Sequence, residues 1–195
     1  MDKKNSKKNE QNLIWNSFLP FYLQYYWTKD WNDEWSIAWY NGPRIEWMEL
    51  YMNLEKLKSD LRTEEGYRDT IYLDTRGFQT IGYGHLVKPS DNFVQGKRYS
   101  KKQLLRVFNY DVQICVQDAY NLCKDLDINE EAVLIVAHMC FQLGRTKTSK
   151  FVKMFEALKN KDYITAGFEM EDSLWRKKHT PARAMRLSEQ MKKLT

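Results

Sequence analysis

Cysteine is scarce in this chain, with three residues among 195. Cys115 and Cys123 lie eight positions apart on what reads as one helix, which separates them by roughly 12 Å along the axis. That distance is too long for a disulfide. Together with Cys140 they form no paired framework, so the sequence predicts a fold that does not depend on oxidation.

Histidine is equally scarce, and no zinc-ligand spacing is present. The three histidines are far from one another in the sequence, and each is predicted to be structural and not a metal ligand. They are His85, His138 and His179. A phosphate-binding glycine motif is incomplete, because Gly82 and Gly84 are followed by Val87 where a third glycine is needed. The sequence therefore predicts neither a metal nor another cofactor.

Long apolar runs are also missing. An aromatic run from Leu13 to Trp27 follows a polar, basic arm, Met1–Gln11, in the outline of a signal sequence or membrane anchor. The run contains polar residues and Pro20, has no small-residue cleavage site, and is too short to span a bilayer. We therefore expect no membrane attachment, and a cleaved signal or anchor is the disfavoured alternative.

Net charge is +5, but it is distributed unevenly. Residues 1–52 carry six basic and seven acidic side chains, whereas residues 53–195 have a net charge of +6. A cationic segment suits an anionic partner such as a cell-wall polymer or a nucleic acid, although a merely soluble basic surface explains the charge equally well. Nucleic-acid binding is disfavoured, because the basic residues are spread out and the tryptophan-rich aromatic segment is not the basic one.

Tryptophan is concentrated in the first 47 residues, which hold six of the seven. Trp27, Trp31, Trp35 and Trp39 recur every four positions, and on a helix they would form one drifting stripe. Such a stripe has to be covered. Either the protein's own globule covers it, or the segment docks on a protein partner in a larger assembly.

Residues 63–85 read as a helix end, a hairpin and a glycine-rich exit. A leucine stripe at helical spacing ends at Gly66, a residue that terminates helices without steric cost. Thr70–Leu73 and Phe78–Ile81 favour strands, and Asp74–Gly77 between them has turn chemistry.

Two carboxylates, Glu65 and Asp74, are thereby placed on the rigid ends of two different elements. Thr80 lies close by on the second strand. This arrangement can hold an acid and a base on opposite sides of one bond.

A long helix is predicted next. Ser100 and Gln103 form a capping-box pattern, and apolar residues then recur in steps of three and four as far as Leu126, over roughly 40 Å. Glu130–Phe141 is apolar almost all round and is expected to be the central buried helix, ended by Gly144.

Two short amphipathic helices, Phe151–Leu158 and Tyr163–Trp175, precede a last helix with Thr180 as cap and Pro181 at its first position. Arg183 then falls in the first turn, where a cation opposes the helix dipole. Either it is a solvated surface charge, or a carboxylate elsewhere holds it. The predicted fold is α+β, mainly α, in two lobes: a small β-ribbon lobe and a helical lobe joined by the long helix.

A specific motif connects these residues. Glu65, Asp74 nine positions later and Thr80 six after that lie within E-G-x-R-x-x-x-Y-x-D-T-x-G-x-x-T-I-G-x-G-H, which resembles the signature of the bacteriophage-type lysozymes, in particular the T-even phage endolysin branch. Other matching segments follow in the family's order: Phe108–Val112, Phe141–Gly144, Trp175 and Thr180–Ala184. The resemblance covers residues 53–195, and the Trp-rich extension, residues 1–52, has no counterpart in it.

The resemblance implies hydrolysis of the β-1,4 bond between N-acetylmuramic acid and N-acetylglucosamine in peptidoglycan. Glu65 would be the general acid, while Asp74 and Thr80 would hold and activate the attacking water in an inverting mechanism. Arg183 matches the family arginine that pairs with the catalytic glutamate. His85 resembles the family's structural histidine. An active enzyme would be made in the host cytoplasm and act on the periplasmic cell wall.

Leu86, Phe141 and Gln142 fall on positions that line the family's cleft. Met154 and Glu169 stand where that family has polar sugar-contacting residues, which is a departure from its pattern. With the added extension, this departure leaves a second reading open: a lysozyme fold used as a structural subunit of a larger assembly, such as a phage particle, with reduced or no activity.

Overall fold

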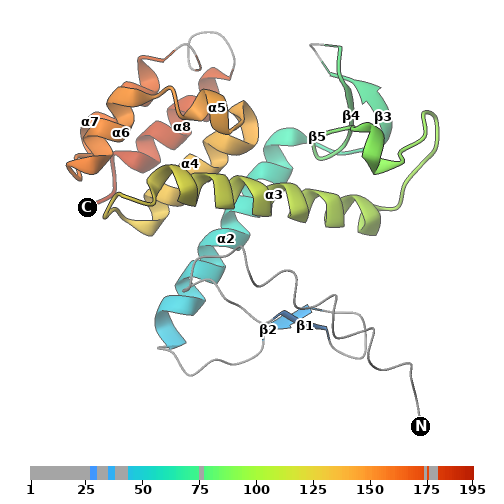
Figure 1. Ribbon diagram of the computed structural model, residues 1–195, viewed down its shortest axis with the longest axis horizontal. Helices are drawn as coiled ribbons and strands as arrows, with labels where there is room; N and C mark the ends of the chain where they lie inside the picture. Colours follow the sequence, from blue (N-terminus) through green and yellow to red (C-terminus); the bar gives the residue numbers. More distant parts are fainter. Residues whose placement is uncertain (1–26, 30–34, 38–43, 75–76, 174, 176–179) are drawn as a thin grey trace. The chain divides into compact units, whose positions relative to one another are not determined.

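The structure is a computed structural model of the whole chain (Figure 1). The residues it describes are 27–29, 35–37, 44–74, 77–173, 175 and 180–195. Their side chains are considered from Asn53 onwards. The chain divides into two compact units, Met1–Arg44 and Ile45–Thr195.

The first unit contains a short antiparallel pair of strands, β1 (Trp27–Lys29) and β2 (Trp35–Ile37). The predicted helical stripe of tryptophans is therefore wrong at Trp27 and Trp35, which lie on strands. Both strands consist mainly of aromatic, β-branched and hydroxyl residues, which fit a pleated strand better than a helix. Spacing of four is also compatible with one face of a strand, so the period alone did not decide the structure.

Other predictions for the first unit concern residues outside those that the structure describes. These are the basic arm Met1–Gln11, nearly all of the apolar run Leu13–Trp27, and the two tryptophans Trp31 and Trp39.

The second unit begins with a helix and a small sheet. Their bounds are α2 (Arg44–Glu65), β3 (Arg68–Leu73), β4 (Gln79–Gly82) and β5 (His85–Leu86). The three strands form one antiparallel sheet in the order β3-β4-β5. The strand β5 was not predicted, because two residues are too few to carry an alternating pattern.

The remaining elements are helical. They are η2 (Pro89–Asp91), α3 (Lys101–Cys123), α4 (Glu130–Leu143), α5 (Arg145–Thr148), α6 (Val152–Lys159), α7 (Tyr163–Glu171) and α8 (Pro181–Met191). This mainly helical unit with a small antiparallel sheet confirms the predicted α+β class. No helix among the described residues is both long and apolar enough to cross a membrane.

Helix boundaries follow the predicted signals closely at some ends. Gly66, with φ at +69°, follows α2. The Ser100 hydroxyl accepts the Gln103 N–H, and Gln103 in turn accepts the Ser100 N–H, as the capping box predicts. Other helix ends differ from the prediction. Helix α3 stops at Cys123 and not at Leu126, because a turn follows in which the Leu126 N–H donates to the Cys123 carbonyl. The helix is therefore about 35 Å long.

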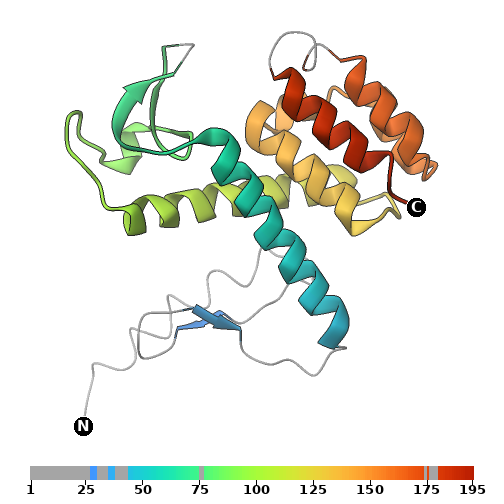
Figure 2. The same cartoon turned by 180° about the vertical axis from the view of Figure 1, so that it is seen from behind.

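The long helix α3 belongs to two apolar cores. Near its start, Leu104 is buried with Ile71 and Ile81 of the sheet. Further along, Phe108 and Val112 are buried in the larger core of the helices. In Figures 1 and 2, α3 accordingly runs from the sheet to the group α4–α8. Separate lobes around these two cores stay a prediction.

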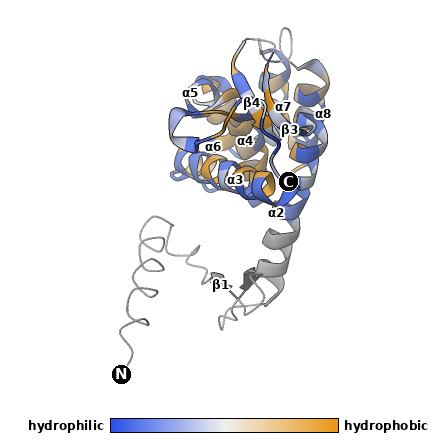
Figure 3. Cartoon of the chain, turned by 90° about the vertical axis from the view of Figure 1, so that its right-hand side faces the viewer, coloured by the Kyte–Doolittle hydropathy of each residue, from blue (hydrophilic) through white to orange (hydrophobic). Residues whose placement is uncertain are grey.

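Helix α4 is the centre of the larger core. Nine consecutive residues, Ala132–Cys140, are buried, which confirms the prediction of a central buried helix. In Figure 3, α4 carries apolar colours while α2 is largely hydrophilic. All three cysteines are unpaired, and burial raises the pKa of the Cys123 thiol to about 12.

His85 ties the sheet to α3. Its Nδ1 lies 2.7 Å from Asp111 Oδ2 on α3, and its Nε2 lies 3.1 Å from Asp91 Oδ2 in η2. Burial alone would lower the pKa of His85, but the hydrogen bonds and charges of Asp111 and Asp91 outweigh it and raise that pKa. A protonated ring donates to both carboxylates, and this histidine therefore fastens three elements together.

Replacing the α3 partner, as Asp111→Asn, is expected to lower the free energy of unfolding by about 2–3 kcal/mol near pH 6, because it leaves a half-buried imidazolium with one carboxylate. The pKa of His85 is higher in the folded chain than its unfolded value of 6.5, so protonation of His85 stabilises the fold. This stabilisation is fully present below pH 6.5 and is lost as the pH rises through the pKa of the folded chain. The difference between Asp111→Asn and the parent chain should therefore shrink from pH 6 to pH 9 in urea unfolding.

A matched control is Asp127→Asn, which removes an ion pair of the same kind at the surface. Lys161 Nζ lies 2.6 Å from Asp127 Oδ2, but both side chains are largely exposed, so little change is expected at any pH. An Asp111→Asn effect that is the same at pH 6 and pH 9 would contradict the role given to His85.

Candidate active site

Glu65 is the last residue of α2 and is held by an arginine from the other end of the unit. Arg183 Nη1 donates a hydrogen bond of 2.7 Å to Glu65 Oε1. Arg183 Nε lies 2.6 Å from Glu64 Oε2, so one guanidinium lies between two consecutive carboxylates. Arg183 is buried in the first turn of α8, where the helix dipole disfavours a cation. Of the two readings of Arg183, the structure therefore shows the one in which carboxylates hold it.

A second layer of charged groups surrounds Glu64. Arg186 Nη2 donates to Glu64 Oε1 at 2.5 Å, and Arg186 Nη1 donates to Asp60 at 3.4 Å. Arg186 also lies 3.1 Å from His138 Nε2. Because a guanidinium can only donate, Nε2 accepts, and the proton of a neutral His138 is on Nδ1.

His138 is neutral in this network. It is buried in α4, and burial, followed by the charges of Arg186 and Arg183, lowers its pKa to about 3. A second positive charge beside two guanidinium groups would be unfavourable. The acidic side of the network is therefore Glu64 with Asp60, and His138 serves as an acceptor.

The turn after β4 packs against Glu65. Gly84 has φ at +82°, and a Cβ placed on it would lie 3.0 Å from Glu65 Oε2. Only glycine fits here without strain or a shift of the carboxylate. Glu65 is thus confined on two sides, by Arg183 at Oε1 and by the Gly84 backbone near Oε2.

Asp74 follows β3 and begins the hairpin turn. Its Oδ1 accepts the Phe78 N–H at 2.8 Å, and its own N–H donates to the Phe78 carbonyl at 2.9 Å. The Gly77 N–H closes the turn on the Asp74 carbonyl at 2.9 Å. The carboxylate is therefore oriented by the backbone of its own turn, as expected for an aspartate at this position.

Thr80 is in the middle of β4, opposite Tyr72 of β3 and Leu86 of β5. It is buried, and its Oγ1 donates to the Phe78 carbonyl at 3.1 Å. Leu86, the predicted cleft residue beside it, is exposed. The sheet register therefore places two of the predicted site residues side by side.

Tyr72 lies within electrostatic range of both candidate catalytic carboxylates. Burial raises the pKa of the Tyr72 phenol, Arg68 lowers it, and the charges of both Glu65 and Asp74 raise it. The phenol is therefore close enough to feel both carboxylates. Its ring also stacks with a cation, since the Arg68 guanidinium lies 4.5 Å from the ring centroid.

Gln142, near the end of α4, makes hydrogen bonds to two other side chains of the protein. Trp175 Nε1 donates to Gln142 Oε1 at 2.9 Å, and Gln142 Nε2 donates to Thr180 Oγ1 at 2.5 Å. Trp175 also donates to Thr180 Oγ1 at 2.9 Å, so this hydroxyl makes no capping bond to α8. Thr180 is the cap residue of α8 and Pro181 its first residue, as predicted, but the Thr180 side chain makes no capping bond because two other donors use its oxygen. Phe141 is half-buried against Phe108, with ring centroids 5.9 Å apart.

A cavity of about 520 Å³ adjoins Trp175. Its walls contain both residues that depart from the family pattern, Met154 and Glu169, together with Phe151 and three lysines. Met154 is fully buried, so it forms part of the apolar wall and offers no hydrogen bond. Among the described residues, no group of histidine, cysteine, aspartate or glutamate could hold a metal ion.

Sequence reasoning missed four contributors to this site: Glu64, Arg186, His138 and Tyr72. The glutamate doublet was visible, and Arg186 lies one turn after Arg183 on the same face of α8. His138 gave no signal, because it is embedded in an apolar run. The catalytic roles of Glu65, Asp74 and Thr80 stay predictions.

Comparison with known families matches residues 62–188 to phage lysozyme. The match includes the acidic end of α2, the sheet and the arginines of α8. The chain therefore belongs to the phage lysozyme family and is a glycoside hydrolase, which confirms the resemblance inferred from the motif.

Three relatives illustrate the range of proteins that share this unit. Probable T4-type lysozyme 2 of Dictyostelium discoideum is 28% identical over 159 residues, covering 69% of this chain and 92% of the relative. Peptidoglycan hydrolase gp36 of Pseudomonas phage phiKMV is 30% identical over 130 residues, or 65% of this chain and 14% of the relative. The pre-baseplate central spike protein Gp5 of Enterobacteria phage T4 is 27% identical over 150 residues, or 66% of this chain and 26% of the relative.

Gly84→Ala tests whether the turn positions the glutamate. The added methyl group meets Glu65 Oε2 and should displace the carboxylate, so we expect glycosidase activity to fall by about 10²-fold, since a displacement of about 1 Å has effects of that size. Positive φ also strains an alanine by about 1–2 kcal/mol, which should appear as a modest loss of stability.

Gly96→Ala is the matched control. Gly96 has φ at +79°, but a Cβ there meets no atom within 4 Å. It should lose similar stability and keep its activity. Equal activities of the two folded variants would show that the Gly84 turn does not position Glu65.

Proposed function

We propose that this chain is a muramidase that hydrolyses the β-1,4 bond between N-acetylmuramic acid and N-acetylglucosamine in peptidoglycan. The observation that carries the proposal is the confinement of Glu65 by Arg183 and by Gly84, next to a sheet that presents Asp74 and Thr80. Family membership supports a glycosidic bond as the target, and one relative is named a peptidoglycan hydrolase.

In this proposal Glu65 donates its proton to the leaving oxygen. Arg183 occupies Oε1, so the proton belongs on Oε2, the oxygen beside Gly84. A fixed arginine on one oxygen thus selects which oxygen acts as the acid. Glu64 and Arg186 serve this step indirectly, because they hold the guanidinium of Arg183 in place.

Asp74 and Thr80 act on the water that attacks the opposite face of the sugar. The Phe78 N–H orients the Asp74 carboxylate, which accepts a proton from the water. The Thr80 hydroxyl, on the neighbouring strand β4, donates its proton to the Phe78 carbonyl and accepts the second hydrogen bond that positions that water. Direct attack by water inverts the anomeric carbon.

The cavity beside Trp175 would hold a further part of the polymer. A volume of about 520 Å³ is enough for a sugar ring or a short peptide. Lys147, Lys150 and Lys153 in its walls outnumber the two acidic residues there, Glu169 and Asp172, which suits a substrate that carries carboxylates. Met154 reduces the hydrogen bonding available in this wall.

A second candidate is a lysozyme unit retained within a larger assembly. The observation that favours it is the similarity to the central spike protein Gp5, in which a segment of this kind makes up about a quarter of the protein. In that case the tryptophan-rich first unit would dock on a protein partner, and activity would be reduced or absent.

Glu65→Gln separates these two functions. It keeps an oxygen for Arg183 but has no acidic proton, so clearing of a suspension of Gram-negative cell walls should slow by about 10²–10⁴-fold while folding is retained. Glu156→Gln, a change of the same kind at an exposed position on α6, should clear walls at the parental rate.

Proton NMR of the first products on a soluble fragment should show the α-anomer, as inversion of a β bond requires. Appearance of the β-anomer would rule out the inverting mechanism. No clearing by the folded parent chain at concentrations where a lysozyme standard acts would favour the assembly role.

A further inference from the structure

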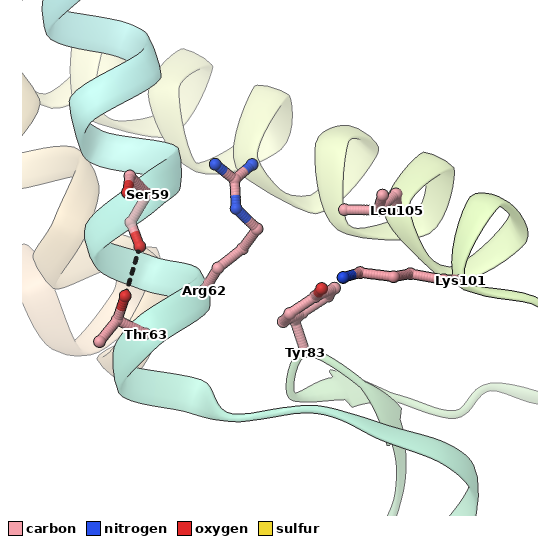
Figure 4. A pocket seen from close by; sticks show the side chains of 6 residues that line it. All are labelled: Ser59, Arg62, Thr63, Tyr83, Lys101 and Leu105. Atoms are coloured by element: carbon pink, nitrogen blue, oxygen red, sulfur yellow. Dashed lines mark hydrogen bonds between the residues drawn. The ribbon is translucent and has the colours of Figure 1, made fainter.

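A second cavity is lined by residues to which no catalytic role is assigned. It has a volume of about 390 Å³ and opens between α2, the turn after β4 and the start of α3 (Figure 4). Six residues line it: Ser59, Arg62, Thr63, Tyr83, Lys101 and Leu105. None of them belongs to the ion network around Arg183, and the hydrolysis proposed above does not use them.

The charge of this cavity is uncompensated. Arg62 and Lys101 line it, and none of its six lining residues is acidic. Within the described part of the chain neither cation pairs with a carboxylate, and the Arg62 guanidinium lies 5.9 Å from the Phe108 ring instead. Arg183 and Arg186, by contrast, each contact two carboxylates.

The start of α3 adds to the positive potential. Lys101 is its first residue, Lys102 follows, and the first turn contains no acidic residue. Helix N-termini carry partial positive charge and normally attract acidic side chains. Cations at this end are unfavourable by themselves, and a bound anion would compensate for both the side chains and the helix end.

Tyr83 supplies a hydroxyl on a buried ring at the same place. Its ring is 7% exposed and is fixed between Tyr67 and Phe108, with centroid distances of 5.1 and 5.2 Å. In the described part of the chain no hydrogen bond uses its hydroxyl. Figure 4 shows the hydroxyl end of Tyr83 beside the amine of Lys101. An unpartnered hydroxyl on a buried ring is a ready donor to a ligand.

Ser59 adds a second hydroxyl one turn before Thr63 on α2. The Thr63 hydroxyl donates to the Ser59 carbonyl at 3.0 Å, so its proton is already used. The donors that converge on the cavity are therefore a guanidinium, an ammonium and the hydroxyls of Tyr83 and Ser59. A tetrahedral oxyanion with several acceptor oxygens matches such a set.

We propose that this cavity binds a phosphate group, either free or as part of a larger molecule. Its volume exceeds that of one phosphate, which leaves room for water or for a substituent on the phosphate. Two cations suit the charge of a phosphate monoester or inorganic phosphate at neutral pH. The site is independent of the glycosidase activity.

The test is an amide NMR titration of the full chain with sodium phosphate, against sodium chloride at the same ionic strength. We expect saturable shifts confined to residues 59–63, 83 and 101–105. The double variant Arg62→Gln with Lys101→Gln should weaken binding by at least about tenfold. Tyr83→Phe, which keeps the ring, should weaken it by about fivefold through loss of one hydrogen bond.

The control is Lys159→Gln with Lys193→Gln, which removes the same charge at two exposed positions. It should change affinity less than about twofold. The proposal fails if phosphate gives no saturable local shift in the folded parent chain. It fails equally if the control pair weakens binding as much as the cavity pair.

The source of the phosphate is distinguished by adding vesicles. Binding to phosphatidylglycerol vesicles that is lost in the cavity pair, with no binding to phosphatidylcholine, would identify a lipid head group. Binding of inorganic phosphate without vesicle binding would identify a soluble ligand. Both results support the cavity as a phosphate site.

Discussion

The ion pair between Arg183 and the Glu64–Glu65 doublet is the constraint on which the candidate site depends. It joins the end of α2 to the start of α8, which are 118 positions apart in the sequence. A buried guanidinium is expensive to desolvate and is tolerated only where carboxylates compensate for it. The same contact that fixes the helix ends therefore also fixes the orientation of the residue proposed as the acid.

Other charged side chains extend this pair into a larger network. Arg186 pairs with both Glu64 and Asp60, and His138 stays neutral because burial and two guanidinium groups lower its pKa to about 3. The neutral His138 ring accepts a hydrogen bond from Arg186 and adds no charge to the network. The network that joins the two helix ends therefore also holds Glu65, the residue proposed as the acid, through Arg183.

Much of this fold could be predicted, because its signals are local. The glycine after α2, the capping box of α3 and the apolar length of α4 each act within one element, and each was found as predicted. The strand pair at Trp27 and Trp35 was not, since a period of four fits both a helix and a strand face. For the site, a motif names Glu65 and Asp74, and their catalytic roles stay predictions. The partners Arg186 and His138 come from segments that are distant in the sequence, so their contacts could not be predicted from residue spacing. The hydrogen bonds of Thr180 could not be predicted either, because their donors, Gln142 and Trp175, lie on other segments.

A double-mutant cycle on Arg183→Met and Glu65→Gln tests the central claim most directly. Urea unfolding of the parent chain, both single variants and the double variant gives the coupling between the two side chains without any assumption about substrate. If Arg183 holds Glu65 as described, the coupling should be about 1–3 kcal/mol, because the pair is largely shielded from water. A coupling below about 0.5 kcal/mol, the value for independent sites, would contradict the account.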